Sequence, residues 1–277
     1  MIRRIVLCLL GVGLLGFLAA ASPAGASTNG TVYVVHGIPG VTVDVYVNGA
    51  KTLSGFAPGT VAGPLSLPAG NYTIKIYKAG SNPASTTPVI NSTVALPAGA
   101  NASLVANLTA SGSPTLTTFV NDVSAAPAGD GRLIVRHTAA APAVDVLAGG
   151  SPVFTGLVNG KGDQANLPAG TVSASVVATG TTTPVLIGPA NVTVTAGMAT
   201  VVYAVGAPAS GSSASTLGVV TQQIPLASAT MTVHTGTSGL LDKGRSGLPV
   251  WALTVLVLAG AGMAFGGFSL RRARVRS

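Results

Sequence analysis

The 277-residue chain is poor in charged and aromatic side chains, which make up 7% and 4% of it, and it contains no glutamate. Its single cysteine, Cys8, excludes an internal disulfide. Without glutamate the H-E-x-x-H metalloprotease motif is also absent. Glycine and proline are abundant instead, with 37 and 18 residues. This composition is unlike that of a helical enzyme and is typical of many short strands joined by turns.

The N-terminal segment has the pattern of an export signal. The pair Arg3-Arg4 precedes an apolar run from Ile5 to Ala21, and Ala24-Gly25-Ala26 forms a small-x-small cleavage site. We therefore predict a signal peptide over residues 1–26 and a mature chain that begins at Ser27. The alternative is an uncleaved N-terminal anchor.

The C-terminal segment has the pattern of a membrane span. Leu248 to Leu270 contains no charge and is long enough to cross a hydrocarbon core of ~30 Å. Trp251 lies near the outer end, where an indole favours the membrane interface. Four arginines follow, and they predict a cytoplasmic tail. The expected location is therefore the plasma membrane, crossed once, with the N-terminus extracytoplasmic and the C-terminus cytoplasmic.

The formal net charge of +8 comes largely from the two ends of the chain. They hold six of the 14 Lys and Arg residues, so the remainder carries 8 cations against 6 aspartates, or +2 (14 − 6 − 6). The six terminal cations are Arg3, Arg4, Arg271, Arg272, Arg274 and Arg276. Charge therefore gives no indication of nucleic-acid binding. Gly262 and Gly266 in the predicted span have the spacing of a helix-dimer motif, so a homodimer is one alternative.

An internal repeat organises the region between the two ends. His36 and Asp44 in VYVVHGIPGVTVDVYVNG correspond to His137 and Asp145 in LIVRHTAAAPAVDVLAGG, with one offset of 101 (137 − 36 and 145 − 44). Leu67 to Gly70 recurs as Leu167 to Gly170. Such self-similarity indicates two copies of one structural unit.

Each copy has the sequence pattern of strands. In Val41 to Val47, valines alternate with polar or amphipathic residues, which is the period of a half-buried strand. Asn48-Gly49 follows and favours a type I′ hairpin turn. Tyr72 to Lys78 alternates again, with Tyr72, Ile74 and Ile76 on one face. Short strands at this spacing predict β-sandwiches of an Ig-like or transthyretin-like kind.

These patterns define a complete domain plan. It consists of a signal peptide (1–26), a first β-sandwich domain (27–123), a linker (124–131), a second β-sandwich domain (132–223), a flexible stalk (224–247), a transmembrane helix (248–270) and a basic tail (271–277).

The copies resemble a bacterial family of domains of unknown function, number 4397, which often occurs as tandem copies in exported proteins. Copy one carries the resemblance in Val32 to His36, Val43 to Gly49 and Leu67 to Thr73. Copy two carries it in Arg136-His137, Ala141 to Val146 and Leu167 to Gly170. It departs at Leu147 to Gly150 and at Val172, and copy one departs at Val35, which stands where copy two has Arg136. The resemblance implies a β-sandwich and an envelope location, and it implies no reaction.

The repeated polar residues are the candidates for chemistry. His36 with Asp44, and His137 with Asp145, have the side chains of a metal site or an acid–base pair. A metal site needs three or four ligands, and each copy offers two. The alternative is a strand-end histidine bonded to a loop and an aspartate on the solvent face of its strand. We assign no catalytic, cofactor-binding or metal-ligating residue.

The sequence thus predicts a non-enzymatic surface protein that displays two β-sandwich modules in a structural or adhesive role. G-x-S-x-G and P-loop motifs are absent. The alternative is an extracytoplasmic receptor for a glycan, a lipid or a small molecule. No cofactor is expected, and the partners are the membrane and a cell-wall or extracellular ligand.

Overall fold

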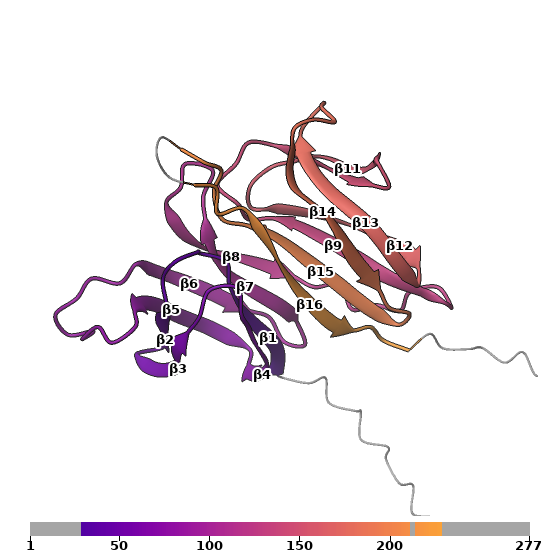
Figure 1. The fold of residues 1–277 in the computed structure, drawn as a ribbon. Coiled ribbons are helices and arrows are strands. Elements are labelled where there is room, and N and C mark those ends of the chain that lie inside the picture. Colours follow the sequence, from indigo (N-terminus) through magenta and orange to yellow (C-terminus); the bar gives the residue numbers. More distant parts are fainter. Residues whose placement is uncertain (1–28, 211–213, 229–277) are drawn as a thin grey trace, which may run out of the picture. The chain divides into compact units, whose positions relative to one another are not determined.

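The computed structural model describes residues 29–210 and 214–228. In these ranges every regular element is a β-strand (Figure 1), which confirms the expected all-β fold. No helix in the described part of the chain is long and apolar enough to span a membrane. The predicted signal peptide, transmembrane helix and tail lie outside the described residues.

The first eight strands, which we call module 1, form two four-stranded sheets. Their orders are β4-β1-β7-β8 (the β1 sheet) and β3-β2-β5-β6 (the β2 sheet). β1 and β7 are parallel, whereas the other neighbouring pairs are antiparallel. The strands are β1 Asn29–His36, β2 Val43–Val47, β3 Ala50–Phe56, β4 Val61–Pro68, β5 Gly70–Lys78, β6 Ile90–Leu96, β7 Asn101–Leu108 and β8 Pro114–Val120.

The next eight strands, module 2, repeat this topology strand for strand. Their orders are β12-β9-β15-β16 (the β9 sheet) and β11-β10-β13-β14 (the β10 sheet), with β9 and β15 parallel. The strands are β9 Asp130–His137, β10 Val144–Ala148, β11 Ser151–Leu157, β12 Lys161–Pro168, β13 Gly170–Ala178, β14 Val185–Val194, β15 Met198–Val205 and β16 Gly218–Pro225.

Alternating side chains build each sandwich as the sequence predicts. Val43, Val45, Ile74 and Ile76 point between the two sheets of module 1 and join its core. Asn48 and Gly49 have φ angles of 49° and 85°, as the predicted hairpin turn between β2 and β3 requires. Leu133, Val135, Val144 and Val146 belong to the corresponding core of module 2.

A third core joins the two modules. In β1, Val32 packs inside module 1, while Tyr33 and Val35 face the opposite way, toward module 2. The β1 sheet and the β9 sheet therefore bury these faces against each other. Module 1 contributes Tyr33, Val35 and Val105, and module 2 contributes Ile134, Ala199, Val201, Tyr203, Val220, Ile224 and Leu226. The modules are thus two parts of one packed unit.

The strands extend past two of the predicted boundaries. The second domain was expected to end at residue 223 and the stalk to start at 224, but β16 continues to Pro225 and Ile224 is 0% exposed. Val220, Gln222 and Ile224 alternate inward, so the apolar period of β16 extends beyond the predicted end. β9 starts at Asp130, inside the predicted linker.

Candidate functional site

The repeated aspartates are buried, contrary to the solvent-facing position considered for them. Asp44 accepts hydrogen bonds from the Gly55 backbone N–H at 2.8 Å and from the Gly80 N–H at 3.4 Å. Lys51 Nζ lies 2.8 Å from Asp44 Oδ2, and the Asp44 side chain is 3% exposed. The carboxylate therefore ties the irregular end of β3 to the turn after β5.

Asp145 repeats this arrangement in module 2. It accepts from the Gly156 N–H at 2.7 Å and from the Gly180 N–H at 2.8 Å. Gly156 and Gly180 have φ angles of 66° and 77°, which favour glycine. At the position equivalent to Lys51 module 2 has no lysine, so backbone N–H groups are the main donors to Asp145. The aspartate that recurs in both modules thus acts as a structural clamp, because it holds two backbone segments together.

Hydrogen bonds control the ionisation of both aspartates. The bonds from Lys51 and Gly55 lower the pKa of Asp44 from 3.8 to about 2, against the opposing effect of burial. The bonds from Gly180 and Gly156 lower the pKa of Asp145. A carboxyl group held in its ionised form is a poor general acid or base near neutral pH.

The repeated histidines form hydrogen bonds with loops, which agrees with the alternative of a strand-end histidine bonded to a loop. His36 Nε2 donates to the Val41 carbonyl at 2.7 Å, and its Nδ1 accepts from the Ile38 N–H at 3.3 Å. His137 Nε2 lies 2.8 Å from the Pro142 carbonyl. Burial lowers the pKa of His36, while the bond to Val41 acts in the opposite direction.

Histidine and aspartate are not bonded to each other in either module. Each has its own partners within the described residues, and no cluster of three or more potential metal ligands occurs among them. The two pairs therefore hold loops in place and do not converge on a common cleft.

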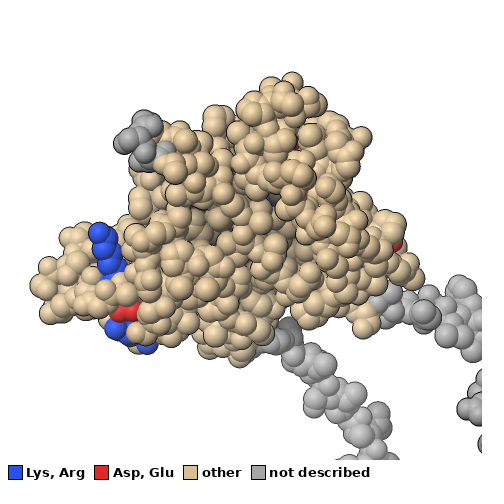
Figure 2. All heavy atoms as spheres, viewed as in Figure 1, with Lys and Arg blue, Asp and Glu red and all other residues tan. Residues whose placement is uncertain are grey.

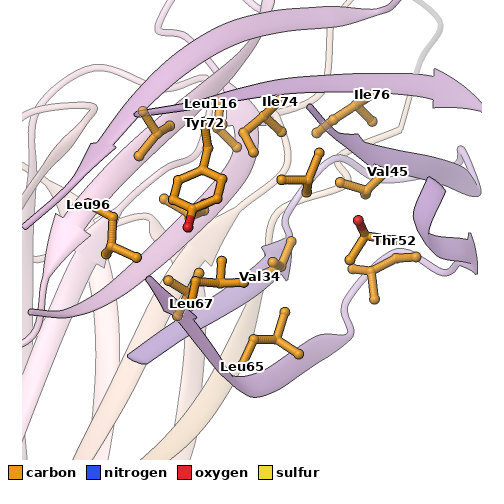
Figure 3. A pocket seen from close by; sticks show the side chains of 15 residues that line it. Val34, Val45, Thr52, Leu65, Leu67, Tyr72, Ile74, Ile76, Leu96 and Leu116 are labelled. Atoms are coloured by element: carbon orange, nitrogen blue, oxygen red, sulfur yellow. The ribbon is translucent and has the colours of Figure 1, made fainter. Parts of the chain in front are cut away.

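An apolar cavity of about 80 Å³ lies between the two sheets of module 1 (Figure 3). Val45, Ile74 and Ile76 form its buried wall, and Leu53 and Leu65 line it from the edge strands β3 and β4. Leu53 and Leu65 are only half-buried. The cavity therefore reaches the surface at the β3–β4 edge.

Tyr72 and Thr52 are the only hydroxyl-bearing residues of the fifteen that line this cavity in the described structure. The Tyr72 hydroxyl donates to the Pro68 carbonyl at 2.6 Å, and the Thr52 hydroxyl donates to the Ala50 carbonyl at 3.3 Å. Both hydroxyls are thus engaged by backbone groups. The remaining lining is aliphatic, so the cavity suits a hydrocarbon ligand.

A second notable site is a buried cation at the junction of the modules. Arg136 donates from Nη1 to the Tyr203 hydroxyl at 2.9 Å and from Nη2 to Asn121 Oδ1 at 2.6 Å. Its guanidinium stacks on Phe119 at 4.5 Å and on Tyr203 at 5.3 Å. The Tyr203 hydroxyl in turn donates to Gln222 Oε1 at 2.8 Å. This network lies at the edge of the shared core.

A surface hollow of about 180 Å³ opens beside Arg136, between β8 and β12. Phe119, Val120, Asp163 and Gln164 are among its lining residues. Figure 2 shows one face of the molecule, on which Lys, Arg and Asp residues are few and gather mainly at one end of module 1. The hollow therefore has mixed character, in contrast to the apolar cavity of module 1.

The fold defines an all-β protein of two paired sandwich modules. Residues 30–147 match the family described as "Domain of unknown function (DUF4397)", which supports the resemblance seen in the sequence. The matched range begins in β1, covers the rest of module 1 and ends in β10 of module 2. No curated protein matches the chain.

Sequence reasoning singled out the histidines and aspartates but missed the cavity and the Arg136 network. Alternation in β5 did place Tyr72, Ile74 and Ile76 on one face, and that face lines the cavity. The contrast between Val35 and Arg136 was the available signal for the network. It marks a position at which copy two has a buried charge and copy one has an apolar side chain.

Proposed function

We propose that the chain is a non-enzymatic protein of the bacterial surface, which displays two joined β-modules in a structural or adhesive role. The main support is the bonding of the repeated His and Asp residues, because each of their side chains forms a hydrogen bond with a backbone group. The shared core adds support because it joins the two modules into one packed unit that can be displayed together.

The proposal also includes the location predicted from the sequence. In this proposal the predicted signal peptide and the predicted span over Leu248–Leu270 support an extracytoplasmic position for both modules. A cell-wall component or an extracellular molecule is then the expected contact. Pairing of two chains through Gly262 and Gly266 remains a prediction.

Truncation tests this proposal directly. A chain that stops after Gly247 loses the predicted anchor and should appear in the medium, while the full chain stays with the membrane. The control is a full-length chain with Gly262→Leu, which keeps the apolar span and should be retained. Firm membrane retention of the truncated chain would contradict the proposal.

The second candidate function is an extracytoplasmic ligand-binding module. One observation favours it, namely the apolar cavity that opens between β3 and β4 of module 1. A closed core would stabilise the module better, because cavities cost about 24 cal/mol for each Å³. Ligand binding would explain why module 1 keeps an open apolar cavity despite this cost in stability.

A further inference from the structure

The two modules differ at the edge where the cavity of module 1 opens. Leu53 in β3 is paired with Val45, and Phe154 in β11 is paired with Val146, so Leu53 and Phe154 occupy equivalent positions. Leu53 is half-buried at the mouth of the cavity, whereas Phe154 is 4% exposed and belongs to the core of module 2. The larger ring thus closes in module 2 the edge that is open in module 1.

The cavity of module 2 confirms this difference. It measures about 50 Å³ and is lined in part by Ala174, Ile187 and Ala190, which lie on the β13–β14 side. Among the described residues, none from β11 or β12 lines it. The cavity of module 1 therefore reaches the edge formed by the third and fourth strands of its module, whereas this cavity of module 2 does not.

The dimensions of the module 1 cavity restrict the ligand. Its volume of about 80 Å³ is roughly half that of the engineered ~150 Å³ cavity that takes up benzene. A ring system does not fit completely, whereas the end of an unbranched chain does. The rest of such a chain would lie in the mouth against Leu53, Leu65 and Leu67, which are half-buried leucines.

The lining excludes polar ligands from the inner part of the cavity. Its two hydroxyl groups already donate to backbone carbonyls, so a buried polar group of a ligand would find few partners. A sugar ring would leave several hydroxyls unpaired there. A methyl-terminated chain needs no partner and gains from burial of each methylene group.

We infer that the β3–β4 cleft of module 1 binds the methyl end of an unbranched alkyl chain, of the kind found in the acyl chain of a lipid or in a free fatty acid. This inference rests on the second candidate function and does not depend on the structural or adhesive role. The alkyl end lies between the two sheets, and the polar head remains outside the β3–β4 edge.

Photolabelling tests the inference on the full chain in membranes, without detergent. Two probes are used, a fatty acid and a phospholipid, each with a diazirine near the methyl end of one acyl chain. Labelled peptides are mapped by mass spectrometry. We expect label on the cavity-lining segments of β3, β4 and β5, and the more efficient probe distinguishes a free acid from a lipid chain as the source.

Leu53→Phe copies the residue that seals module 2 and should reduce cavity labelling by roughly tenfold, the loss expected if about two methylene groups are excluded. Val185→Phe is the matched control, because Val185 is 43% exposed on β14 and lies outside the cavity. Labelling of the control should equal that of the wild type. Equal labelling of Leu53→Phe and wild type would overturn the inference.

Competition provides a test that needs no variant. Straight-chain alkanoic acids should displace the fatty-acid probe with affinities that rise about fourfold per added methylene group until the cavity is full. 2-Naphthoic acid, a fused-ring acid, should compete poorly because its rings exceed the cavity. Equal competition by the ring compound, or label confined to other parts of the chain, would refute alkyl binding and leave the release experiment unaffected.

Discussion

Arg136 of module 2 donates a hydrogen bond over 2.6 Å to Oδ1 of Asn121, the residue that follows the last strand of module 1. Both residues are buried. No carboxylate forms an ion pair with Arg136 in the described part of the chain. Neutral acceptors and two aromatic rings therefore stabilise its charge, and they come from both modules. The relationship is a direct polar link between the two modules.

Replacing Arg136 should weaken the junction between the modules. Arg136→Ala removes the two aromatic contacts and leaves the hydroxyl of Tyr203 and the amide of Asn121 without this donor. We expect the free energy of unfolding to fall by about 3 kcal/mol. Urea unfolding at neutral pH measures this change.

Lys161→Ala is the control for that experiment, because Lys161 is exposed on the neighbouring strand β12. Its effect should stay within about 0.5 kcal/mol. Equal stability of Arg136→Ala and Lys161→Ala would show that the buried cation does not hold the modules together.

Asp44 should make the stability of the fold dependent on pH in the acid range. Its pKa is lowered from 3.8 to about 2 in the folded chain, so its contribution is complete above pH 3.8 and is lost as the pH falls toward about 2. Asp44→Asn should cost about 2 kcal/mol at neutral pH, and this deficit should shrink across that window.

Chemical unfolding of Asp44→Asn and the wild type at several pH values checks this prediction. Asp130→Asn provides a control carboxylate that is no part of the clamp. A deficit for Asp44→Asn that stays constant from pH 7 to pH 2 would contradict the assigned role of the ion pair with Lys51.

His36 should remain neutral in the folded chain below the pH at which a free histidine is protonated. Burial lowers its pKa from 6.5, and the Ile38 N–H faces its Nδ1, where a proton would have to be added. The unfolded chain therefore binds more protons as the pH falls below 6.5, and folding stability declines.

NMR titration of the His36 ring protons measures this pKa in the folded chain. His36→Gln, which keeps a side-chain donor for the Val41 carbonyl, should reduce the slope of stability against pH. A folded-state pKa at or above 6.5 would contradict the described burial.

Phe154 should contribute more to stability than its exposed neighbour. Phe154→Ala removes a ring that is 4% exposed and opens the β11–β12 edge, so we expect a loss of about 3–5 kcal/mol. Val153→Ala, at a residue that is 40% exposed, should change stability by less than about 0.5 kcal/mol. Thermal unfolding compares the two, and similar losses would argue against a sealing role for the ring.

Much of the fold was predictable because local patterns fix it. The valine alternation around Val45 and the Asn48-Gly49 turn each follow from a short segment, and the structure confirms both. The repeat of His36 and Asp44 at a constant offset likewise indicated that one strand order occurs twice. The strand and the turn depend on neighbours in sequence, and the repeat needs only a comparison of the two copies.

The features that sequence reasoning missed depend on distant contacts. The run Val32 to Val35 is apolar on both faces, but nothing in it identifies the β9 sheet as the partner of the second face. The alternation of the strand around Asp44 predicted a solvent-exposed side chain. The irregular pairing of β2 and β3 instead brings the Gly55 N–H within hydrogen-bond distance of the Asp44 carboxylate. The cavity lies beside Leu53, where module 2 has the larger Phe154, and this difference in side-chain size has meaning only after the strands are paired.

Protease treatment of intact cells tests the surface location, on which the proposed function depends most directly. Cells that produce the full chain with a tag after Ser277 are exposed to a broad-specificity protease that does not enter them. We expect the region from residue 29 to residue 228 to be cleaved from the cells, with a short tagged C-terminal fragment left in the membrane. Survival of the intact chain on these cells, combined with its cleavage after lysis, would contradict the account.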